Sequence, residues 1–565
     1  MKKCFTFSII GCGLTGTSML YQLIKKLKNH LKKPIPIKIH VFEKNKFPGS
    51  GFPYDKSNLF AFHICNMPAQ EMSIDADNPD DLTIWFKKNK SRLTQTLQEF
   101  EQWLLDPVYK DSITEFYPRM IMGEYLKERF KKSLEIAKQK KISVVVHSMS
   151  EVTNIKDKGN HLVLNVMDLE KKTSCDILSD QVLISTGHWS NKQNQPGYYA
   201  SPWPAKMLLE NIPKGSKVAV IGSGLSAIDT VLTLFSDGCF SKSKNNELDY
   251  TPSKNPRQIT MYSRNGLLPK VRGKSSLYKN QYFCESGFDM LMKSCNGNLS
   301  LFDLSALLKK ELEKAYNKSV NWKEFMPSYE DALSSLKKEI FLAKNGDNPN
   351  GDILWQTIVN QALPVITKAY QNLIPEHRNL FENRFSSVFM AHAAVMPFVN
   401  AQKILALMEQ NLLTIKSLGS NYQIKRIPGI QMHEFSYNDD NGSLKKERFP
   451  YVIDARGQAI SYRTNPSSLA KNLLASEMIQ IEKINLSQDL SKTNNVENEP
   501  NVFESGSILI DPKTNRVISG DKQLSKPGNI YAVGMMTRGQ IINASMAREC
   551  VLSTRKIVDQ IIKKI

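Results

Sequence analysis

The sequence predicts an α/β fold with two units built around parallel sheets and a helical insertion. Two stretches, "FTFSIIGCGLTGTSML" and "KVAVIGSGLSAIDTVLTL", each combine an apolar strand, a glycine turn and a helix-like apolar repeat. Between about 275 and 400, long stretches have apolar residues recurring at three and four positions, which is typical of helices. A chain of 565 residues is long enough for two to four domains.

Each glycine turn fits the pattern of a phosphate-binding loop. Its first small residue permits a tight turn, its second lets a pyrophosphate approach the backbone, and its third lets helix and strand pack closely. The helix that follows presents free N–H groups to the phosphates. These small residues are Gly11, Gly13 and Gly16 in the first glycine loop, and Gly222, Gly224 and Ala227 in the second. We therefore predict two dinucleotide-binding Rossmann-type domains.

The residue after the next strand predicts which dinucleotide each loop binds. In the first unit "IKIHVFEK" supplies a strand that ends at Glu43. The carboxylate of Glu43 can accept hydrogen bonds from the ribose hydroxyls of an adenosine. In the second unit "RQITMYSRNGLLP" offers Ser263 and Arg264 and no acid, which suits the 2′-phosphate of NADP. The alternative is a surface arginine that merely follows a strand.

Two further strands are expected to approach the first cofactor. "DQVLISTGHWS" contains an apolar strand that ends in Thr186 and Gly187, and "GNIYAVGMMTRGQ" contains a strand that ends at Gly534. In flavoproteins with two dinucleotide sites such strands run beneath the FAD, and their glycines leave room for it. We therefore assign FAD to the first loop and NADPH to the second.

The order of these blocks resembles a known family. With "FPGSGFPYD", "HICNMPAQEMS" and "YPRMIMGEYL" between the loops, the chain is similar to the FAD/NAD(P)-binding proteins grouped with FAD-dependent urate hydroxylase and aspartate N-monooxygenase. More distantly it resembles flavin-containing and N-hydroxylating monooxygenases. Two departures stand out. A basic His-Arg-His-Arg stretch common in the family reads "AHAAVMP" here, with only His392 retained, and Met535 follows Gly534 where an aspartate is common.

The resemblance implies an NADPH-dependent FAD monooxygenase that forms a flavin hydroperoxide and hydroxylates a small nucleophilic substrate, an amine or amino acid, with O₂. Disulfide reductases also bind two dinucleotides, but the eight cysteines contain no CxxC pair. Two alternatives stay open: hydroxylation of a ring carbon in a urate-like substrate, and a flavin-binding regulatory module without turnover.

Asn66 is the candidate catalytic residue. In flavin-containing monooxygenases an Asn just ahead of a Lys-Glu-Met segment lies beside the flavin, and here Asn66 precedes Gln70-Glu71-Met72. The alternative is an asparagine that caps a turn before Pro68. Arg119, which precedes a helix, could face a phosphate or an anionic substrate, or could form a surface salt bridge.

The FAD-binding domain is expected to be discontinuous. Residues 1–200 form its first part, 205–420 form the NADPH-binding domain with the helical insertion, and 421–565 complete the FAD-binding domain, judged from "VIDARG" and "IYAVG".

Composition narrows the class of protein. The scattered cysteines fit neither a disulfide framework nor a metal site and suit a reducing cytoplasm. No run of eighteen apolar residues predicts a membrane span. The net charge of +20 is attributed to lysine-rich helix surfaces, with weak attraction to anionic surfaces as the alternative. No motif indicates specific binding of nucleic acid.

Overall fold

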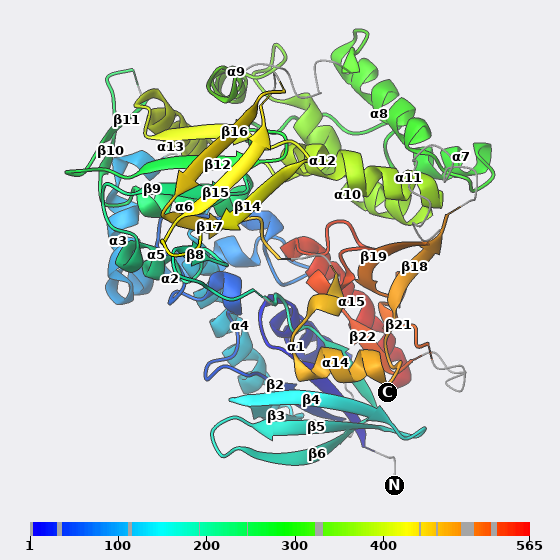
Figure 1. Ribbon diagram of the computed structural model, residues 1–565. Coiled ribbons are helices and arrows are strands. Elements are labelled where there is room, and N and C mark those ends of the chain that lie inside the picture. Colours follow the sequence, from blue (N-terminus) through cyan, green and yellow to red (C-terminus); the bar gives the residue numbers. More distant parts are fainter. Residues whose placement is uncertain are drawn as a thin grey trace.

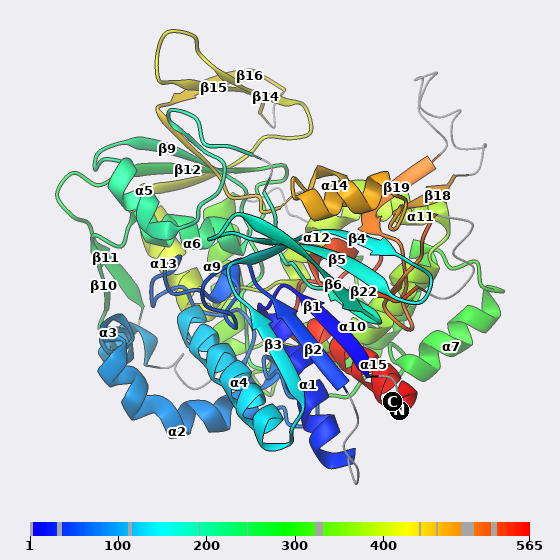
Figure 2. The same ribbon diagram turned by 90° about the horizontal axis from the view of Figure 1, so that it is seen from below.

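The computed structural model describes residues 4–30, 37–110, 116–190, 192–245, 247–322, 331–439, 442–458, 461–486, 502–520 and 528–565. Two separate sheets, each built around parallel strands, carry their own helices, and a further group of helices lies beside them (Figures 1 and 2). The predicted mixed α/β fold is confirmed.

The first sheet has seven strands within the described residues, in the order β20-β21-β22-β7-β1-β2-β3. Neighbouring strands from β22 to β3 are parallel. The bounds are β1 Phe5–Ile10, β2 Ile37–Phe42, β3 Ser143–His147, β7 Gln181–Ile184, β20 Ile510–Asp511, β21 Arg516–Val517 and β22 Ile530–Ala532. Because β1 lies between β7 and β2, the first glycine loop starts in the middle of the sheet.

Both faces of this sheet are covered, which explains why its strands read as apolar runs. Successive side chains of a strand point to opposite faces. Phe7 and Ile9 pack with helices α1 (Leu14–His30) and α15 (Ala547–Lys564). On the other face Ile10 packs with an antiparallel sheet of β4 (Ser150–Asp157), β5 (Leu162–Asp168) and β6 (Thr173–Ser179), and with helix α14 (Ser468–Ala475).

The second sheet repeats this arrangement. Its described strands run in the order β13-β12-β9-β17-β8, and all neighbours are parallel. Helices cover one face, and a three-stranded antiparallel sheet, β14 to β16, packs on the other. The bounds are β8 Tyr198–Tyr199, β9 Lys217–Ile221, β12 Gln258–Ser263, β13 Leu413–Ser417, β14 Tyr422–Arg426, β15 His433–Asn438, β16 Leu444–Phe449, β17 Tyr451–Asp454, α5 Ala205–Asn211, α6 Leu225–Leu234 and α13 Phe398–Glu409.

This sheet corrects the predicted domain boundaries. "VIDARG" was expected in the FAD-binding part, 421–565, but β17 pairs with β9 and β8 in the second sheet. The three-stranded sheet over 422–449 also packs on the second unit. The second unit therefore runs from β8, just before residue 200, to Asp454. The error arose because a short apolar strand carries no information about which sheet it joins.

Most of the helical insertion forms its own apolar cluster, which includes Phe288, Leu312 and Ile358, whereas Leu336 packs in the core of the second unit. The insertion is drawn in green in Figure 1. Its elements are α7 Glu285–Ser294, α8 Leu301–Tyr316, α9 Ala332–Asn345, α10 Leu354–Asn372, α11 Pro375–Leu380, a π-helical turn Phe381–Phe385 and α12 Ser386–Ala393. The predicted insertion at about 275–400 corresponds to these helices.

The remaining described elements include the long, largely buried helix α4. They are α2 Asp81–Thr96, α3 Gln98–Leu105, α4 Arg119–Gln139, β10 Cys239–Lys242, β11 Leu248–Thr251, β18 Ile481–Asn485, β19 Val502–Ile508 and the 3₁₀ turns Phe52–Tyr54, Ala69–Glu71, Pro107–Tyr109, Tyr462–Thr464 and Met535–Thr537. Among the described helices, none is long and apolar enough to cross a membrane.

Buried polar contacts join the two units. At the start of α4, Arg119 forms a 2.7 Å ion pair with buried Asp229 of α6, so Arg119 forms a salt bridge in the interior and not the expected one at the surface. His63 Nε2 lies 2.9 Å from the Thr233 hydroxyl. Lys403 of α13 is buried, and its Nζ donates to the Tyr109 hydroxyl.

Lys403 is a buried cation held by aromatic rings. Its Nζ lies 4.0 Å from the ring centroid of Tyr109 and 4.9 Å from that of Phe240. No carboxylate of the described residues forms an ion pair with it. Burial lowers the pKa of Lys403 to about 7, although the charge of Asp106 acts in the opposite direction.

Candidate functional site

The first glycine loop is shaped by close backbone packing. Gly11 has φ +89°, and a Cβ there would lie 2.6 Å from the Ser185 carbonyl oxygen. A Cβ on Gly16 would lie 2.1 Å from the Gly11 oxygen, so only glycine fits at this place in the first turn of α1. Gly13 is less confined, since its Cβ would meet only the backbone of Gly51, at 3.2 Å. The three predicted glycines therefore do form one tight strand-to-helix turn.

Glu43 lies directly behind this loop. Its Oε2 accepts a hydrogen bond from the Cys12 N–H at 2.9 Å, and its Oε1 accepts from the backbone and side chain of Asn45. A carboxylate oxygen can accept more than one hydrogen bond, so this fixed, buried acid can still receive ribose hydroxyls. Glu43 is thus fixed against the backbone of the first glycine loop.

Thr186, Gly187 and Gly534 meet at the same edge of the first sheet. β7 pairs in parallel with both β1 and β22, so the carboxyl ends of the three strands lie side by side. A Cβ on Gly187 would meet no atom within 4 Å, and one on Gly534 only the Thr15 hydroxyl oxygen at 3.8 Å. Open space borders these two glycines, as a cofactor lying along this edge would need.

The segment "FPGSGFPYD" completes the first loop. The Gly49 N–H donates to the Cys12 carbonyl at 2.8 Å, and the Thr17 hydroxyl donates back to the Gly49 carbonyl at 3.2 Å. Gly51, with φ +68°, lies against Gly13. Sequence reasoning used this segment only as a family marker, yet its glycine spacing was a usable signal of close approach.

The second glycine loop has the same position in the second sheet. Gly222 has φ +112°, and its N–H donates to the Tyr262 carbonyl of the neighbouring strand at 2.6 Å. A Cβ on Gly224 would meet no atom within 4 Å, so this loop opens to free space. Ala227 is fully buried on α6, where a small residue lets the helix approach the strand.

Ser263 is the last residue of β12, and Arg264 follows it, beside that loop. The Ser263 hydroxyl is buried and has no hydrogen-bond partner among the described residues. Arg264 is exposed, and its carbonyl oxygen accepts from the Ser417 hydroxyl at 2.8 Å and from the Gly419 N–H at 3.1 Å. These bonds fix the backbone and leave the guanidinium available to a ligand.

Asn66 lies in a loop that accepts hydrogen bonds from two distant parts of the chain. Arg272 Nη2 donates to the Asn66 carbonyl at 3.2 Å, and Asn360 of α10 donates to Glu71 at 3.1 Å. The half-buried Asn66 amide makes no hydrogen bond within the described part of the chain. The alternative that its side chain caps a turn therefore finds no support in the geometry.

His392 is engaged locally. Its Nδ1 lies 2.9 Å from the Val388 carbonyl, and its ring packs edge-on against Trp355 with centroids 5.3 Å apart. Burial lowers its pKa, so the imidazole is neutral at pH 7. In the described residues no group of three or more His, Cys, Asp or Glu side chains could hold a metal ion.

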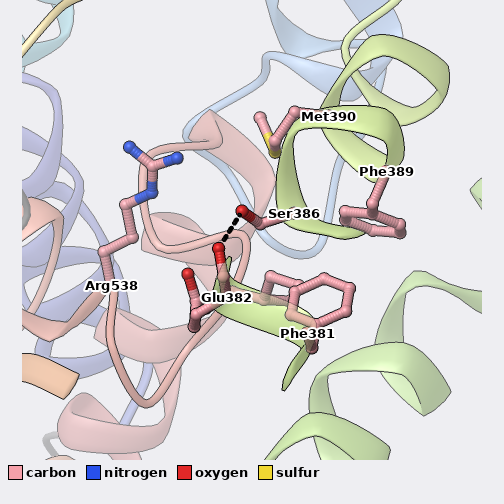
Figure 3. Close-up of a pocket in the computed structure, with 7 residues that line it drawn as sticks. Phe381, Glu382, Ser386, Phe389, Met390 and Arg538 are labelled. Carbon is pink, nitrogen blue, oxygen red and sulfur yellow. Dashed lines mark hydrogen bonds between the residues drawn. The ribbon is translucent and has the colours of Figure 1, made fainter. Parts of the chain in front are cut away.

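Arg538 and the π-helical turn were not found by sequence reasoning. Arg538 lies four residues after Gly534 and lines a pocket together with residues of the insertion (Figure 3). The signal for Arg538 was its position just beyond a cofactor-facing glycine. No local pattern indicates a π-helical turn.

Comparisons with known proteins agree with this geometry. Residues 8–189 match the FAD-NAD(P)-binding family. An uncharacterized protein of Escherichia coli (strain K12), YdhS, is 23% identical over 499 residues, which cover 81% of this chain and 83% of that protein. The matched family segment contains the first glycine loop, Glu43, Thr186 and Gly187.

Two solved structures share the fold. The reduced form of ornithine hydroxylase from Pseudomonas aeruginosa has a TM-score of 0.53 and 12% identity, with 99% of both chains covered. The L-lysine 6-monooxygenase from Pseudomonas syringae has a TM-score of 0.51 and 12% identity, also with 99% of both chains covered. At such identity the likeness extends to the fold alone.

Proposed function

We propose that the protein is an NADPH-dependent FAD monooxygenase that hydroxylates a small nucleophilic substrate, an amine or amino acid. The observation that carries this proposal is the pair of glycine loops at the carboxyl ends of two parallel sheets. The loop that ends at Gly16 would hold the FAD pyrophosphate, and Glu43 its adenosine ribose. The loop that ends at Ala227 would hold NADPH, with its 2′-phosphate at Ser263 and Arg264. Bound FAD would accept hydride and activate oxygen.

The cysteines favour oxygen over a disulfide as the electron acceptor. All eight are free. Cys12 and Cys65, the two nearest the first loop and the Asn66 segment, are buried, and burial raises the pKa of both thiols, that of Cys65 to about 12. Thiols held in this state are poor nucleophiles.

The proposal is tested by spectroscopy of the purified protein. NADPH added under nitrogen should bleach the yellow colour, and air should restore it. A flavin that NADPH does not reduce would overturn the proposal and favour the regulatory module without turnover.

Arg264→Ala should remove most of a preference for NADPH over NADH. A charge-assisted contact to phosphate contributes about 1.5 to 3 kcal/mol, which corresponds to about a ten- to a hundredfold difference in affinity. The measurement is the rate of flavin reduction against coenzyme concentration, with exposed Arg426 replaced by Ala as the control. Equal use of NADH and NADPH by the unmodified protein would contradict the assignment.

Asn66→Ala should leave FAD binding and reduction by NADPH intact but raise the release of hydrogen peroxide in air at least about tenfold. The amide is a hydrogen-bond donor with no acceptor among the described residues, and loss of a donor at a reacting centre typically costs far more than tenfold. Peroxide formed per NADPH consumed is measured beside a melting curve. Asn58→Ala, which removes a bond to the Phe52 carbonyl, is the control. A lowered melting temperature with unchanged peroxide release would show a merely structural role.

A further inference from the structure

A pocket lies where the helical insertion meets the loop after Gly534. Two parts of the chain that are far apart in sequence form it. Figure 3 shows Arg538 on one side and the helical insertion on the other. The lining residues are Phe381, Glu382, Ser386, Phe389, Met390, Arg538 and Ile542.

Two charged side chains line this pocket, the guanidinium of Arg538 and the carboxylate of Glu382. The Arg538 side chain is half-buried, and its guanidinium forms no ion pair or hydrogen bond with the described residues. Glu382, which also lines the pocket, instead accepts a hydrogen bond from the Tyr370 hydroxyl at 2.6 Å. A partly buried guanidinium without a partner is a binding group for a carboxylate.

Besides Arg538, Glu382 and Ser386, the lining is apolar, and part of it comes from an unusual backbone. Phe381 begins the π-helical turn, and the Ser386 hydroxyl donates to the Glu382 carbonyl at 2.8 Å, as Figure 3 shows. π-Helical turns are rare in proteins, and many of those that occur lie at functional sites. Phe389, Met390 and Ile542 add apolar surface, so the ligand needs an apolar body as well as an anionic group.

The pocket adjoins the edge of the first sheet that receives the proposed cofactor. Arg538 follows Gly534 by four residues, and Gly534 ends the segment from β22. Exclusion of water lowers the pKa of His188, the residue after Gly187, and the charge of Arg538 lowers it further. Arg538 therefore lies shortly after the carboxyl end of β22, which is hydrogen-bonded to β7.

Buried bonds hold the two walls of the pocket together. Arg378 of the insertion donates to Glu482 at 3.0 and 2.6 Å and also to the Gly539 carbonyl, one residue from Arg538. Thr367 of α10 donates to Asn543 at 2.9 Å. A site held by such contacts is formed before a ligand arrives.

We infer that this pocket binds a small carboxylate with an apolar body, with Arg538 as its positioning contact. The inference rests on the proposed function, because it names the substrate class of the same site. The carboxylate would pair with Arg538, and the apolar body would lie on Phe381, Phe389 and Met390.

The test is a binding titration with FAD-loaded protein and without NADPH, using hexanoate, hexanamide and hexylamine as probes. Hexanoate should bind about ten- to a hundredfold more tightly than either neutral hexanamide or cationic hexylamine. Arg538→Met should reduce hexanoate to the affinity of hexanamide, whereas Arg538→Lys should retain most of the preference. Arg548→Met, which removes an exposed arginine, is the control and should change nothing.

Two results would overturn the inference: equal binding of hexanoate and hexanamide, or unchanged hexanoate binding by Arg538→Met. Met390→Trp provides a second check, since a bulky ring in the pocket should weaken all three probes. Binding requires neither reduction nor oxygen. A protein that binds hexanoate through Arg538 but is not reduced by NADPH would therefore overturn the proposed function and leave the pocket assignment standing.

Discussion

Gly13→Asp should give folded protein that purifies without FAD and is therefore colourless. The new Cβ would lie 3.2 Å from the Gly51 Cα, a tight contact that small backbone shifts can relieve. The carboxylate beyond it would point into the space proposed for the pyrophosphate and repel it. We expect FAD affinity to fall by at least about a hundredfold, equivalent to about 3 kcal/mol. Flavin absorbance per protein after dialysis is the measurement.

Two matched variants serve as controls. Gly13→Ala separates the effect of charge from that of crowding, and Gly224→Asp separates the second loop from the first. Gly13→Ala adds the same Cβ without charge and should retain most of the FAD. Gly224→Asp adds a carboxylate where a Cβ meets no atom within 4 Å, so folding and FAD content should be unchanged. Its reduction by NADPH should fall by at least about a hundredfold. Stoichiometric FAD in Gly13→Asp would show that the first loop does not hold the flavin.

Lys403→Met should stabilise the protein at pH 7 and flatten the pH dependence of its stability. Lys403 is buried, no carboxylate of the described part of the chain forms an ion pair with it, and burial lowers its pKa to about 7. In the unfolded chain a lysine titrates near its ordinary pKa of about 10.4. Between these two values the unfolded state binds more protons than the folded state, so the free energy of unfolding rises with pH.

The expected pH effect on the free energy of unfolding can be given a magnitude and tested against a control variant. From pH 7 to pH 9 the free energy of unfolding of the unmodified protein should rise by about 2 kcal/mol relative to Lys403→Met. Urea titrations at several pH values provide the measurement. Lys513→Met, which removes an exposed lysine, should follow the unmodified protein. Parallel pH profiles for the unmodified protein and Lys403→Met would mean that Lys403 titrates at its ordinary pKa.

Local pattern was sufficient for the elements whose geometry is local. Each glycine loop lies between a strand and a helix, and Glu43 and Arg264 follow the expected strands, because one short segment determines all of these features. The chain path between sheets could not be predicted in the same way. β17 joins the second sheet through pairing with β9, more than two hundred residues earlier, and nothing in "VIDARG" encodes that partner.

The pocket at Arg538 escaped prediction for a related reason. Its walls come from Phe381–Phe385 and from the loop after Gly534, and only tertiary packing brings them together. Sequence reasoning recognised the strand before Gly534 but had no means of placing the insertion above it. Binding groups contributed by one segment can be predicted from sequence, whereas a pocket assembled from two cannot.

During synthesis the second unit should finish folding before the first, although the first unit begins the chain. The second sheet can be completed once β17 has been made, because β17 is the last of its strands along the chain. β17 then pairs with β8 and β9, which were made earlier. The first sheet cannot close until β22 joins β7, and its core also needs Ile557 and Ile561 of α15 against α1. Domains generally fold as units while the chain emerges from the ribosome. Here the inserted unit can fold first, while β1 and the first glycine loop wait for the last helix of the chain.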